Sequence, residues 1–417
     1  MNQVVDLTTG SLTGDPARSG DLPPLRVLIG LEGLALGGCP INALQLGRTL
    51  RSRGHEVSVF AIDEDVKVSL LPFAESCGFS PVILPTTAGI VARARQIRAL
   101  AARAEADVVH VFGPWLGPAA SIAAASRRHQ GAVVTNWTME NVFYTPRHTP
   151  MIVGTNDLAT ELRARHPGPV WLMEPPVDLE ADAPDHARGR VFRGELGLDD
   201  DHVVAVLVSR VDSHMKTESM RYAIEACARI RDPLFRFVIV GDGDAFAEMN
   251  ALADAVNQRL GWQAVLLPGA RHDPRPAYDA ADIALGMGGS ALRALAHSKP
   301  LVVLGENGFA RTFSADTRDY FYEAGFFGDS PEPDPVAHLT GEIQALLKLR
   351  DRGSLGRYGL NEVRERFGLE IMSQHLEAIY RQTLTSLPGA ARRLGAAGNV
   401  TARTVVHELR RALPSHA

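Results

Sequence analysis

Two stretches of the sequence place phosphate-binding residue types shortly after a run of mainly apolar residues. The first follows Val203–Val208 and contains Arg210 and, in the same polar segment, Lys216. The second follows the run 282–285, and its turn offers N–H groups and a hydroxyl from three consecutive residues: Gly288, Gly289 and Ser290. Paired cations and the N–H groups at a helix start both neutralise phosphate. The sequence therefore predicts a diphosphate site, in which Arg210 and Lys216 stabilise the charge of a leaving group.

Glycines and polar residues near other strand ends are further candidates for this site. A Val240-Gly-Asp-Gly turn follows one β-branched run, and a Glu-Asn pair follows the run 301–304. The carboxyl ends of parallel strands meet at one edge of a sheet, where ligands bind. Plain turns and surface charges are the alternative roles. The expected contacts to the phosphate-bearing ligand are Gly37, Gly38, Gly241, Gly243, Arg271, Arg293, Glu306 and Asn307.

The first half of the chain contains polar residues that suit a second substrate. His110 lies in the run 107–111 and is a candidate acid–base residue, although a histidine on a buried strand also serves as a hydrogen-bonded core residue. Three further residues are candidate contacts to this second substrate: Asn136, Trp137 and Glu140. Turn formation and packing are their alternative roles. No Asp or His cluster in the sequence suggests a metal site, so we expect no metal and no cofactor.

The elements that position these residues alternate between strand and helix in both halves. In the first half we expect strands at 25–30, 56–61, 107–111 and 132–135, and helices at 41–53, 91–103 and 119–128. In the second half we expect strands at 203–208, 235–240, 264–267, 282–285 and 301–304, and helices at 220–230, 245–260 and 290–297. This alternation predicts two doubly wound α/β domains, each with a parallel sheet covered on both faces.

The alternation stops at Trp171-Leu-Met-Glu-Pro-Pro, where two prolines suit a connector between domains, and it then starts afresh. Both ends of the chain predict flexible segments, because the beginning is rich in Gly, Ser, Thr and Pro and the end is rich in arginine. For the basic tail, contact with a membrane surface is the alternative to solvation. The expected ranges are a leader at 1–24, a first domain at 25–176, a second domain at 177–368, a helix at 369–384 that packs back on the first domain, and a tail at 385–417.

Composition and charge exclude several classes of function. The chain of 417 residues is 45% hydrophobic and 22% charged, as is usual for a globular enzyme. A net charge of -5 gives no broad basic field for nucleic acid. Three widely spaced cysteines form neither a disulfide framework nor a zinc motif. The sequence has no signal-peptide pattern and no long apolar run, so we expect a cytoplasmic protein without a transmembrane segment, and a homodimer is compatible with it.

Five segments together resemble a family of retaining glycosyltransferases. They are the Gly37-Gly38 loop with its helix and Gly54-His55-Glu56-Val57, the Asp107-Val-Val-His110 strand, the Ser209-Arg210 to Lys216 loop, the Val240-Gly-Asp-Gly turn, and the Gly288-Gly289-Ser290 turn with Lys299-Pro300. The resemblance is to the GT-B glycosyltransferases of the family 4 type, and it extends from residue 25 to about 380. It departs from the family's pattern at Leu292-Arg293-Ala294, where the family has a glutamate in place of Arg293.

The resemblance implies a GT-B fold, in which two Rossmann-like domains face each other across a cleft. It further implies a nucleoside-diphosphate sugar as donor, with UDP or GDP as the nucleotide, and a small-molecule acceptor. Transfer would proceed with retention and without a metal ion, because cationic side chains replace it. The Ala- and Arg-rich composition is common in bacteria that decorate secondary metabolites, including antibiotics, so the acceptor is expected to be of that kind.

Three alternatives to sugar transfer follow from the same residues. A Rossmann-type oxidoreductase is disfavoured, because no G-x-G-x-x-G joins the first strand and helix. A nucleotide-sugar epimerase would share the GT-B layout. A non-catalytic nucleotide-sugar-binding relative is compatible with Arg293 in place of the family's glutamate.

Overall fold

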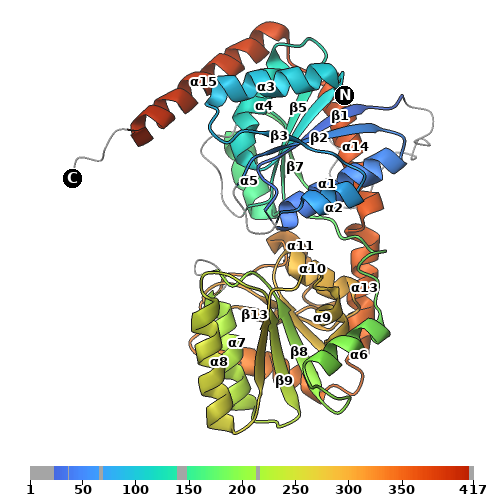
Figure 1. Ribbon diagram of the computed structural model, residues 1–417, viewed down its shortest axis with the longest axis vertical. Coiled ribbons are helices and arrows are strands. Elements are labelled where there is room, and N and C mark those ends of the chain that lie inside the picture. Colours follow the sequence, from blue (N-terminus) through green and yellow to red (C-terminus); the bar gives the residue numbers. More distant parts are fainter. Residues whose placement is uncertain (1–22, 36, 65–68, 139–147, 213–216, 413–417) are drawn as a thin grey trace. The chain divides into compact units, whose positions relative to one another are not determined.

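The chain divides into two compact units, each built around its own sheet (Figure 1). The computed structural model describes residues 23–35, 37–64, 69–138, 148–212 and 217–412, with side chains described as far as residue 404. Unit 1 comprises Met1–Pro176 and Leu369–Ala417, and unit 2 comprises Val177–Gly368. The last segment of the chain therefore belongs to the same unit as the first.

Unit 1 is built on a parallel sheet of seven strands. Its strands are β1 (Arg26–Leu31), β2 (Glu56–Ile62), β3 (Val82–Leu84), β4 (Val108–Phe112), β5 (Gly131–Asn136), β6 (Met151–Val153) and β7 (Val170–Leu172). Their order in the sheet is β3-β2-β1-β4-β5-β6-β7. The central strands consist of buried β-branched and apolar residues, as a sheet covered on both faces requires.

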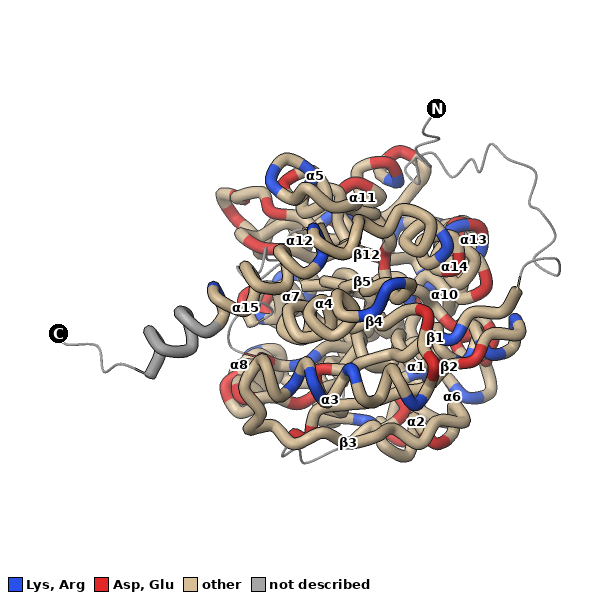
Figure 2. The backbone as a smooth tube through the Cα atoms, turned by 90° about the horizontal axis from the view of Figure 1, so that it is seen from above, with Lys and Arg blue, Asp and Glu red and all other residues tan. Residues whose placement is uncertain are grey.

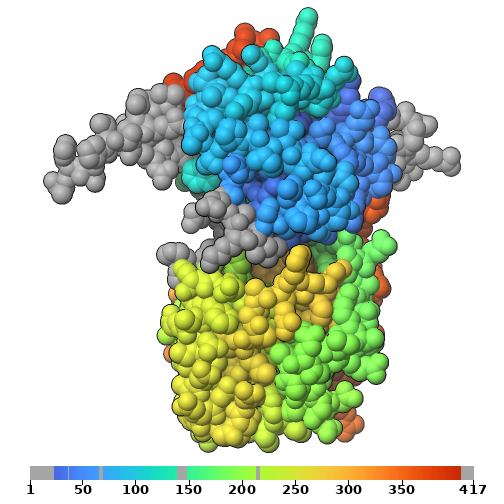
Figure 3. Space-filling view, viewed as in Figure 1, coloured from blue at the N-terminus to red at the C-terminus, as the bar shows by residue number. Residues whose placement is uncertain are grey.

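Helices cover both faces of this sheet. They are α1 (Gly38–Ser52), α2 (Leu71–Ser76), α3 (Ile90–Arg103), α4 (Gly117–Ala125), α5 (Asn156–Arg165), α14 (Leu369–Thr385) and α15 (Ala390–Ala412), and a 3-10 turn, η2 (Pro114–Leu116), precedes α4. Helix α14 packs against α1, and Arg53 after α1 pairs with Glu377 of α14 at 3.0 Å. In the view of Figure 3, the surface of unit 1 comes mainly from the first third of the chain, coloured blue to cyan.

Unit 2 contains a six-stranded sheet that is parallel except at one edge. Its strands are β8 (Val203–Val208), β9 (Phe235–Val240), β10 (Val265–Gly269), β11 (Ile283–Gly286), β12 (Leu301–Leu304) and β13 (Ala310–Thr312), in the order β10-β9-β8-β11-β12-β13. Its helices are α6 (His186–Glu195), α7 (Thr217–Ile230), α8 (Phe246–Leu260), α9 (Arg275–Ala280), α10 (Gly289–Ala296), α11 (Arg318–Ala324), α12 (Pro335–Lys348) and α13 (Gly353–Arg366).

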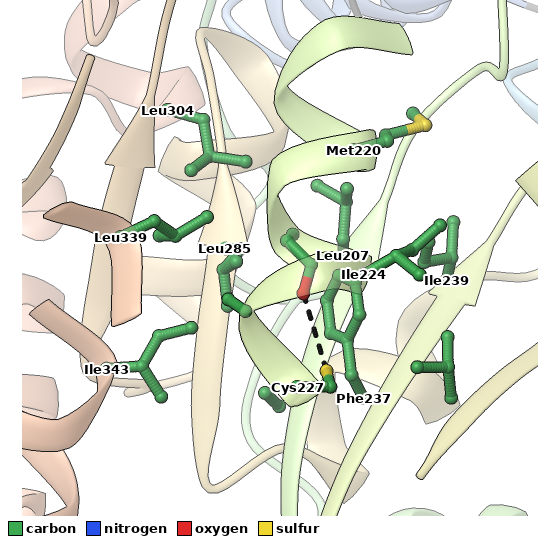
Figure 4. Packing of buried hydrophobic residues seen from close by; sticks show 14 of the residues in the cluster. Leu207, Met220, Ile224, Cys227, Phe237, Ile239, Leu285, Leu304, Leu339 and Ile343 are labelled. Atoms are coloured by element: carbon green, nitrogen blue, oxygen red, sulfur yellow. Dashed lines mark hydrogen bonds between the residues drawn. The ribbon is translucent and has the colours of Figure 1, made fainter. Parts of the chain in front are cut away.

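The core of unit 2 lies between the sheet and the helices α7, α8 and α12. Leu207, Phe237 and Leu285 point from three neighbouring strands toward Ile224 of α7 and Ile343 of α12 (Figure 4). All five side chains are buried. This packing fixes the strands from which the loops at the carboxyl edge of the sheet leave.

The C-terminal segment differs from the solvated tail that the sequence predicts. Residues 390–412 form helix α15, which packs on α4 and α3. Val400 is buried in the core of unit 1, and Arg393 donates to the carbonyl groups of Arg127 and Gln130 at 2.8 and 3.2 Å. Alanine, leucine and arginine favour helix, and burying one apolar face holds that helix on the unit. Neighbouring α3 carries arginines and no acidic residue (Figure 2).

Candidate functional site

Unit 2 changes its direction of winding at β8. This strand pairs with β9 on one side and with β11 on the other, and all three are parallel. The loops after β8 and β11 therefore leave the same edge of the sheet beside each other. In doubly wound sheets ligands bind at this edge. The two phosphate-binding stretches that the sequence predicts follow these two strands.

The glycine turn after β11 starts helix α10 at this edge. Gly288 has a φ of +53°, a conformation that favours glycine, and its N–H donates to the carbonyl of Phe326 at 2.7 Å. The Ser290 hydroxyl donates to the carbonyl of Met287 at 3.0 Å. Helix α10 begins at Gly289 without a side-chain cap. The N–H of Ser290 donates to the Met287 carbonyl at 3.3 Å, which is longer than usual, so an anion can replace this bond and use the first-turn N–H groups.

The loops after β8 and β9 are in close backbone contact. A β-carbon at Gly241 would lie 1.8 Å from the carbonyl oxygen of Ser209, and one at Gly243 would lie 2.3 Å from that of Val211. The N–H of Ser209 also donates to the carbonyl of Val240 at 3.1 Å. Gly241 and Gly243 thus fix the path of the loop that carries Arg210, and their contact with a ligand stays a prediction.

Arg210 extends from this loop into solvent. Its side chain is 70% exposed, and Nη1 lies 3.2 Å from the carboxylate of Asp212. An exposed ion pair of this kind contributes at most about 1 kcal/mol, so an anionic ligand can displace it. Lys216, the second predicted cation, lies outside the described residues.

Three other predicted ligand contacts are held in local structure. The guanidinium of Arg271 pairs with Glu195 at 3.2 Å, next to α6. Glu306 lies in the turn after β12. Its N–H donates to the carbonyl of Gly328, in the segment after α11, at 2.9 Å. In the same turn Asn307 has a φ of +53° and donates to Asp329 at 2.7 Å. Arg271 is thus engaged by α6, while Glu306 and Asn307 keep the strand-end position that the sequence predicts.

Arg293 lies one turn into α10 beside buried carboxylates. Its Nε is 3.8 Å from Asp182, and His297, one turn further along, lies 2.7 Å from Asp279 and 3.7 Å from Asp182. Burial alone would lower the pKa of His297, but the two carboxylates raise it above its usual value. The helix that starts at the glycine turn is therefore anchored by a buried charge network.

Unit 1 has a corresponding edge at β1, which pairs with β2 and β4. Gly37 and Gly38 open helix α1 beyond this edge. Gly37 has a φ of -169°, which is extended backbone, and a β-carbon at Gly38 would meet nothing within 4 Å. The positions therefore do not require glycine for steric reasons, and their role in ligand binding stays a prediction.

Comparisons with known families identify both halves of the chain. Residues 36–180 match the model of Glycosyltransferase Family 4, and residues 202–346 match that of Glycosyl transferases group 1. Together the two matches cover most of the chain. The chain belongs to the glycosyltransferases. A search of curated proteins finds no match to this glycosyltransferase.

Solved structures share the fold of this glycosyltransferase at low sequence identity. Anabaena HepE in complex with UDP has a TM-score of 0.66 and 15% identity, with 87% of this chain and 100% of that chain covered. A glycosyltransferase from Rickettsia africae has a TM-score of 0.66 and 14% identity, covering 87% and 99%. A putative UDP-N-acetylglucosamine 2-epimerase from Listeria monocytogenes has a TM-score of 0.58 and 13% identity, covering 86% and 96%. These likenesses confirm the predicted GT-B fold.

His110 occupies the core of the glycosyltransferase, which argues against the catalytic role expected for it. The side chain is fully buried on β4, with Nδ1 2.7 Å from the hydroxyl of Tyr380 and Nε2 2.7 Å from that of Thr135. Burial lowers the pKa of His110 to about 3. Since both ring nitrogens are engaged and the ring is neutral, His110 is the hydrogen-bonded core residue that the sequence left as the alternative.

Two of the three predicted acceptor contacts serve local structure at the end of β5. Asn136 is buried, and its side-chain oxygen accepts from the N–H and the hydroxyl of Thr138 at 3.0 and 2.6 Å. The indole N–H of Trp137 donates to the carbonyl of Met173 at 2.8 Å. These are the turn and packing roles that the sequence left open. Glu140 lies outside the described residues.

Glu32, which follows β1 at the edge of unit 1, is a further candidate that the sequence does not predict. One carboxylate oxygen accepts from the backbone N–H groups of Trp115 and Leu116, the latter at 3.2 Å. Burial raises the pKa of Glu32 to about 7 although these N–H groups lower it. Burial, together with the nearby charge of Glu32, raises the pKa of the Cys39 thiol to about 12. A single glutamate after a strand has no sequence signature, since its partners lie far along the chain.

The described part of the chain contains neither a group of metal ligands nor a helix that could span a membrane. Within it, no group of three or more His, Cys, Asp or Glu residues could hold a metal ion. Its helices likewise include none that is long and apolar enough to cross a membrane.

Proposed function

We propose that this glycosyltransferase moves a sugar from a nucleoside-diphosphate sugar, with UDP or GDP as the nucleotide, to a small-molecule acceptor. One observation carries the proposal: the Gly288 turn at the start of α10 and the Arg210 loop leave neighbouring strands at the point where unit 2 changes its winding. An uncapped helix start and an accessible guanidinium provide what a diphosphate requires.

In the proposed mechanism the diphosphate binds the N–H groups at Gly289 and Ser290 and the side chains of Arg210 and Lys216. Negative charge grows on the diphosphate as its bond to the anomeric carbon breaks, and the two cations stabilise it. The electron pair of that bond stays on the diphosphate oxygen. The acceptor hydroxyl attacks the resulting oxocarbenium-like carbon from the same face, its proton passes to the departing diphosphate oxygen, and the sugar keeps its configuration. No metal ion is needed, because side chains supply the positive charge.

Neighbouring structures support a nucleotide sugar as the donor. HepE was crystallised with UDP, with UDP and glucose, and with UDP-glucose. A pneumococcal O-GlcNAc transferase of the same fold was crystallised with UDP and GlcNAc, with a TM-score of 0.60 and 10% identity. We extend this donor chemistry to the present chain. The acceptor would be a secondary metabolite such as an antibiotic precursor.

The compartment that we propose is the cytoplasm. Its reducing environment suits three cysteines that are free thiols: Cys39, Cys77 and Cys227.

Substitution of the two cations tests this mechanism. Lys216→Ala and Arg210→Ala are each expected to lower kcat by about 10²- to 10³-fold, as for removal of one transition-state contact. Arg259→Ala, an exposed arginine at the far end of α8, is the matched control and should keep full turnover. Sugar transfer is measured by mass spectrometry of the product. Undiminished transfer by Lys216→Ala and Arg210→Ala would refute the assigned roles.

Epimerisation of a nucleotide sugar is the second candidate, favoured by the shared fold of the Listeria epimerase. The two reactions differ in their need for an acceptor. Incubation of the protein with UDP-GlcNAc alone, followed by separation of the sugar nucleotides, distinguishes them. An epimerised sugar nucleotide without any acceptor product would favour the epimerase. Binding without any reaction, across donors and acceptors, would favour a non-catalytic relative.

A further inference from the structure

Glu32 stands at the point where the winding of unit 1 changes direction. It directly follows β1, which pairs with β2 on one side and β4 on the other. The segment after β4 begins with Gly113 and leads into η2 and α4. Ligands of doubly wound sheets bind beyond the strand ends at such a point. A carboxylate there is therefore placed to contact a substrate.

The backbone around Glu32 is shaped to admit its side chain. Gly113 has a φ of +117°, and a β-carbon there would lie 2.0 Å from Cδ of Glu32. Oε1 accepts both N–H groups that open η2, those of Trp115 and Leu116. Among the residues that the structure describes, no donor is bound to Oε2. One oxygen thus orients the carboxylate while the other can still accept a hydrogen bond.

The residue whose backbone holds this carboxylate is aromatic and exposed. Trp115, whose backbone N–H is bound to Oε1, has a side chain that is 59% exposed. An exposed indole offers a flat apolar face, and a carboxylate bound to the backbone of the same residue offers a strong acceptor for a hydroxyl hydrogen. The combination suits a ring that has one apolar face and hydroxyl groups at its edge.

We propose that Glu32 binds the acceptor substrate, a hydroxylated ring compound, and that Oε2 accepts a hydrogen bond from a hydroxyl group of that ring other than the one that attacks the sugar. The proposal rests on the proposed sugar transfer and names the residue of unit 1 that positions its second substrate. No proton is transferred to Glu32 in this role. Its carboxyl has a pKa of about 7, because burial disfavours the charged form. Acceptor binding therefore needs the carboxylate that forms above that pH.

Glu32→Gln separates acceptor binding from the structural role of the side chain. The amide oxygen of glutamine can still accept hydrogen bonds from the two N–H groups of η2. Its NH₂ group takes the place of Oε2 and is a donor, so it cannot accept a hydrogen bond from a hydroxyl group of the substrate. Glu105→Gln is the matched control, because Glu105 is an exposed glutamate of unit 1 that pairs with Arg26. The donor site lies in unit 2 and is unaffected by either change.

The experiment compares both variants with the wild type on a panel of aryl glucosides, aminocyclitols and flavonoids, using the best wild-type acceptor. For Glu32→Gln we expect the acceptor KM to rise, or kcat/KM to fall, by roughly 10- to 100-fold, as for a lost charged hydrogen bond. The wild-type kcat/KM should rise with pH through about 7, and this rise should be absent in the variant. The melting temperature and its increase with the donor should be unchanged.

Wild-type acceptor kinetics in Glu32→Gln would overturn the proposal, as would a fall in transfer that is matched by lost donor binding or lost thermal stability. Transfer by the wild type to none of the ring compounds, in a protein that binds the donor, would overturn it as well. Failure of the wild type to bind any nucleotide sugar would instead overturn the proposed function. The two proposals are therefore distinguished by the donor measurement.

Discussion

His110 on β4 and Tyr380 on α14 share a hydrogen bond of 2.7 Å that joins the first and last parts of unit 1. The histidine is neutral in the fold, because burial lowers its pKa to about 3. The unfolded chain binds a proton below about pH 6.5, whereas the folded chain does not. The contribution of neutral His110 to the free energy of unfolding is therefore complete above about pH 6.5 and is lost as the pH falls toward 3.

Replacement of His110 should change stability and not the pH dependence of catalysis. His110→Gln is expected to lower the free energy of unfolding by about 1–3 kcal/mol at pH 7, because buried hydroxyl partners lose a bond. The variant should also lose less stability between pH 6.5 and 4 than the wild type. Urea unfolding and the pH profile of kcat measure the two effects. A variant whose kcat profile loses an ionisation would restore the catalytic role.

Gly241 should be intolerant of any side chain. A methyl group there would lie 1.8 Å from the backbone oxygen of Ser209 and would push the Arg210 loop aside. For Gly241→Ala we expect a loss of stability of about 1–3 kcal/mol and weaker donor binding. Gly194→Ala is the control, because a β-carbon at this helical position meets nothing within 4 Å. Calorimetric titration with UDP measures binding, and equal affinity in both variants would contradict the loop's role.

His297 should make unit 2 less stable at alkaline pH. Its pKa is raised by Asp182 and Asp279 despite its burial, so the folded state keeps a proton that the unfolded chain releases near pH 6.5. The resulting stability is present below that pH and is lost as the pH rises through the folded-state pKa. His297→Gln should cost about 3–5 kcal/mol at pH 6, as for a broken buried pair, and should flatten this dependence. Urea unfolding from pH 6 to 9 measures both, and a parallel decline in the two proteins would speak against the assignment.

Long apolar runs made most of the fold predictable from sequence. The strands expected at 203–208, 235–240 and 301–304 coincide with β8, β9 and β12, because buried parallel strands require continuous β-branched residues. Three-residue strands such as β3 and β6 were not predicted, since so short a run has no periodicity. The sequence predicts a tail where helix α15 forms, because the apolar residues of this helix become buried only when it packs on α4.

The site was only partly predictable, because several of its features depend on tertiary contacts. The glycine turn at Gly288 has a local signature, and the structure places it at the winding point of unit 2. His110 could not be assigned without Tyr380, which lies 270 residues away. Glu32 acquires its orientation from N–H groups after β4. Sequence periodicity places such residues on a strand or loop and does not reveal which group they bind.

Binding of the diphosphate of a nucleotide sugar by unit 2 can be measured by a thermal-shift titration with UDP-, GDP-, dTDP- and ADP-sugars. A donor at a hundredfold its dissociation constant adds about 2.7 kcal/mol of stability, which corresponds to a rise of several degrees in melting temperature. We predict such a rise for a UDP- or GDP-sugar, and a smaller one in Arg210→Ala. An unchanged melting temperature with every nucleotide sugar at millimolar concentration would contradict the account.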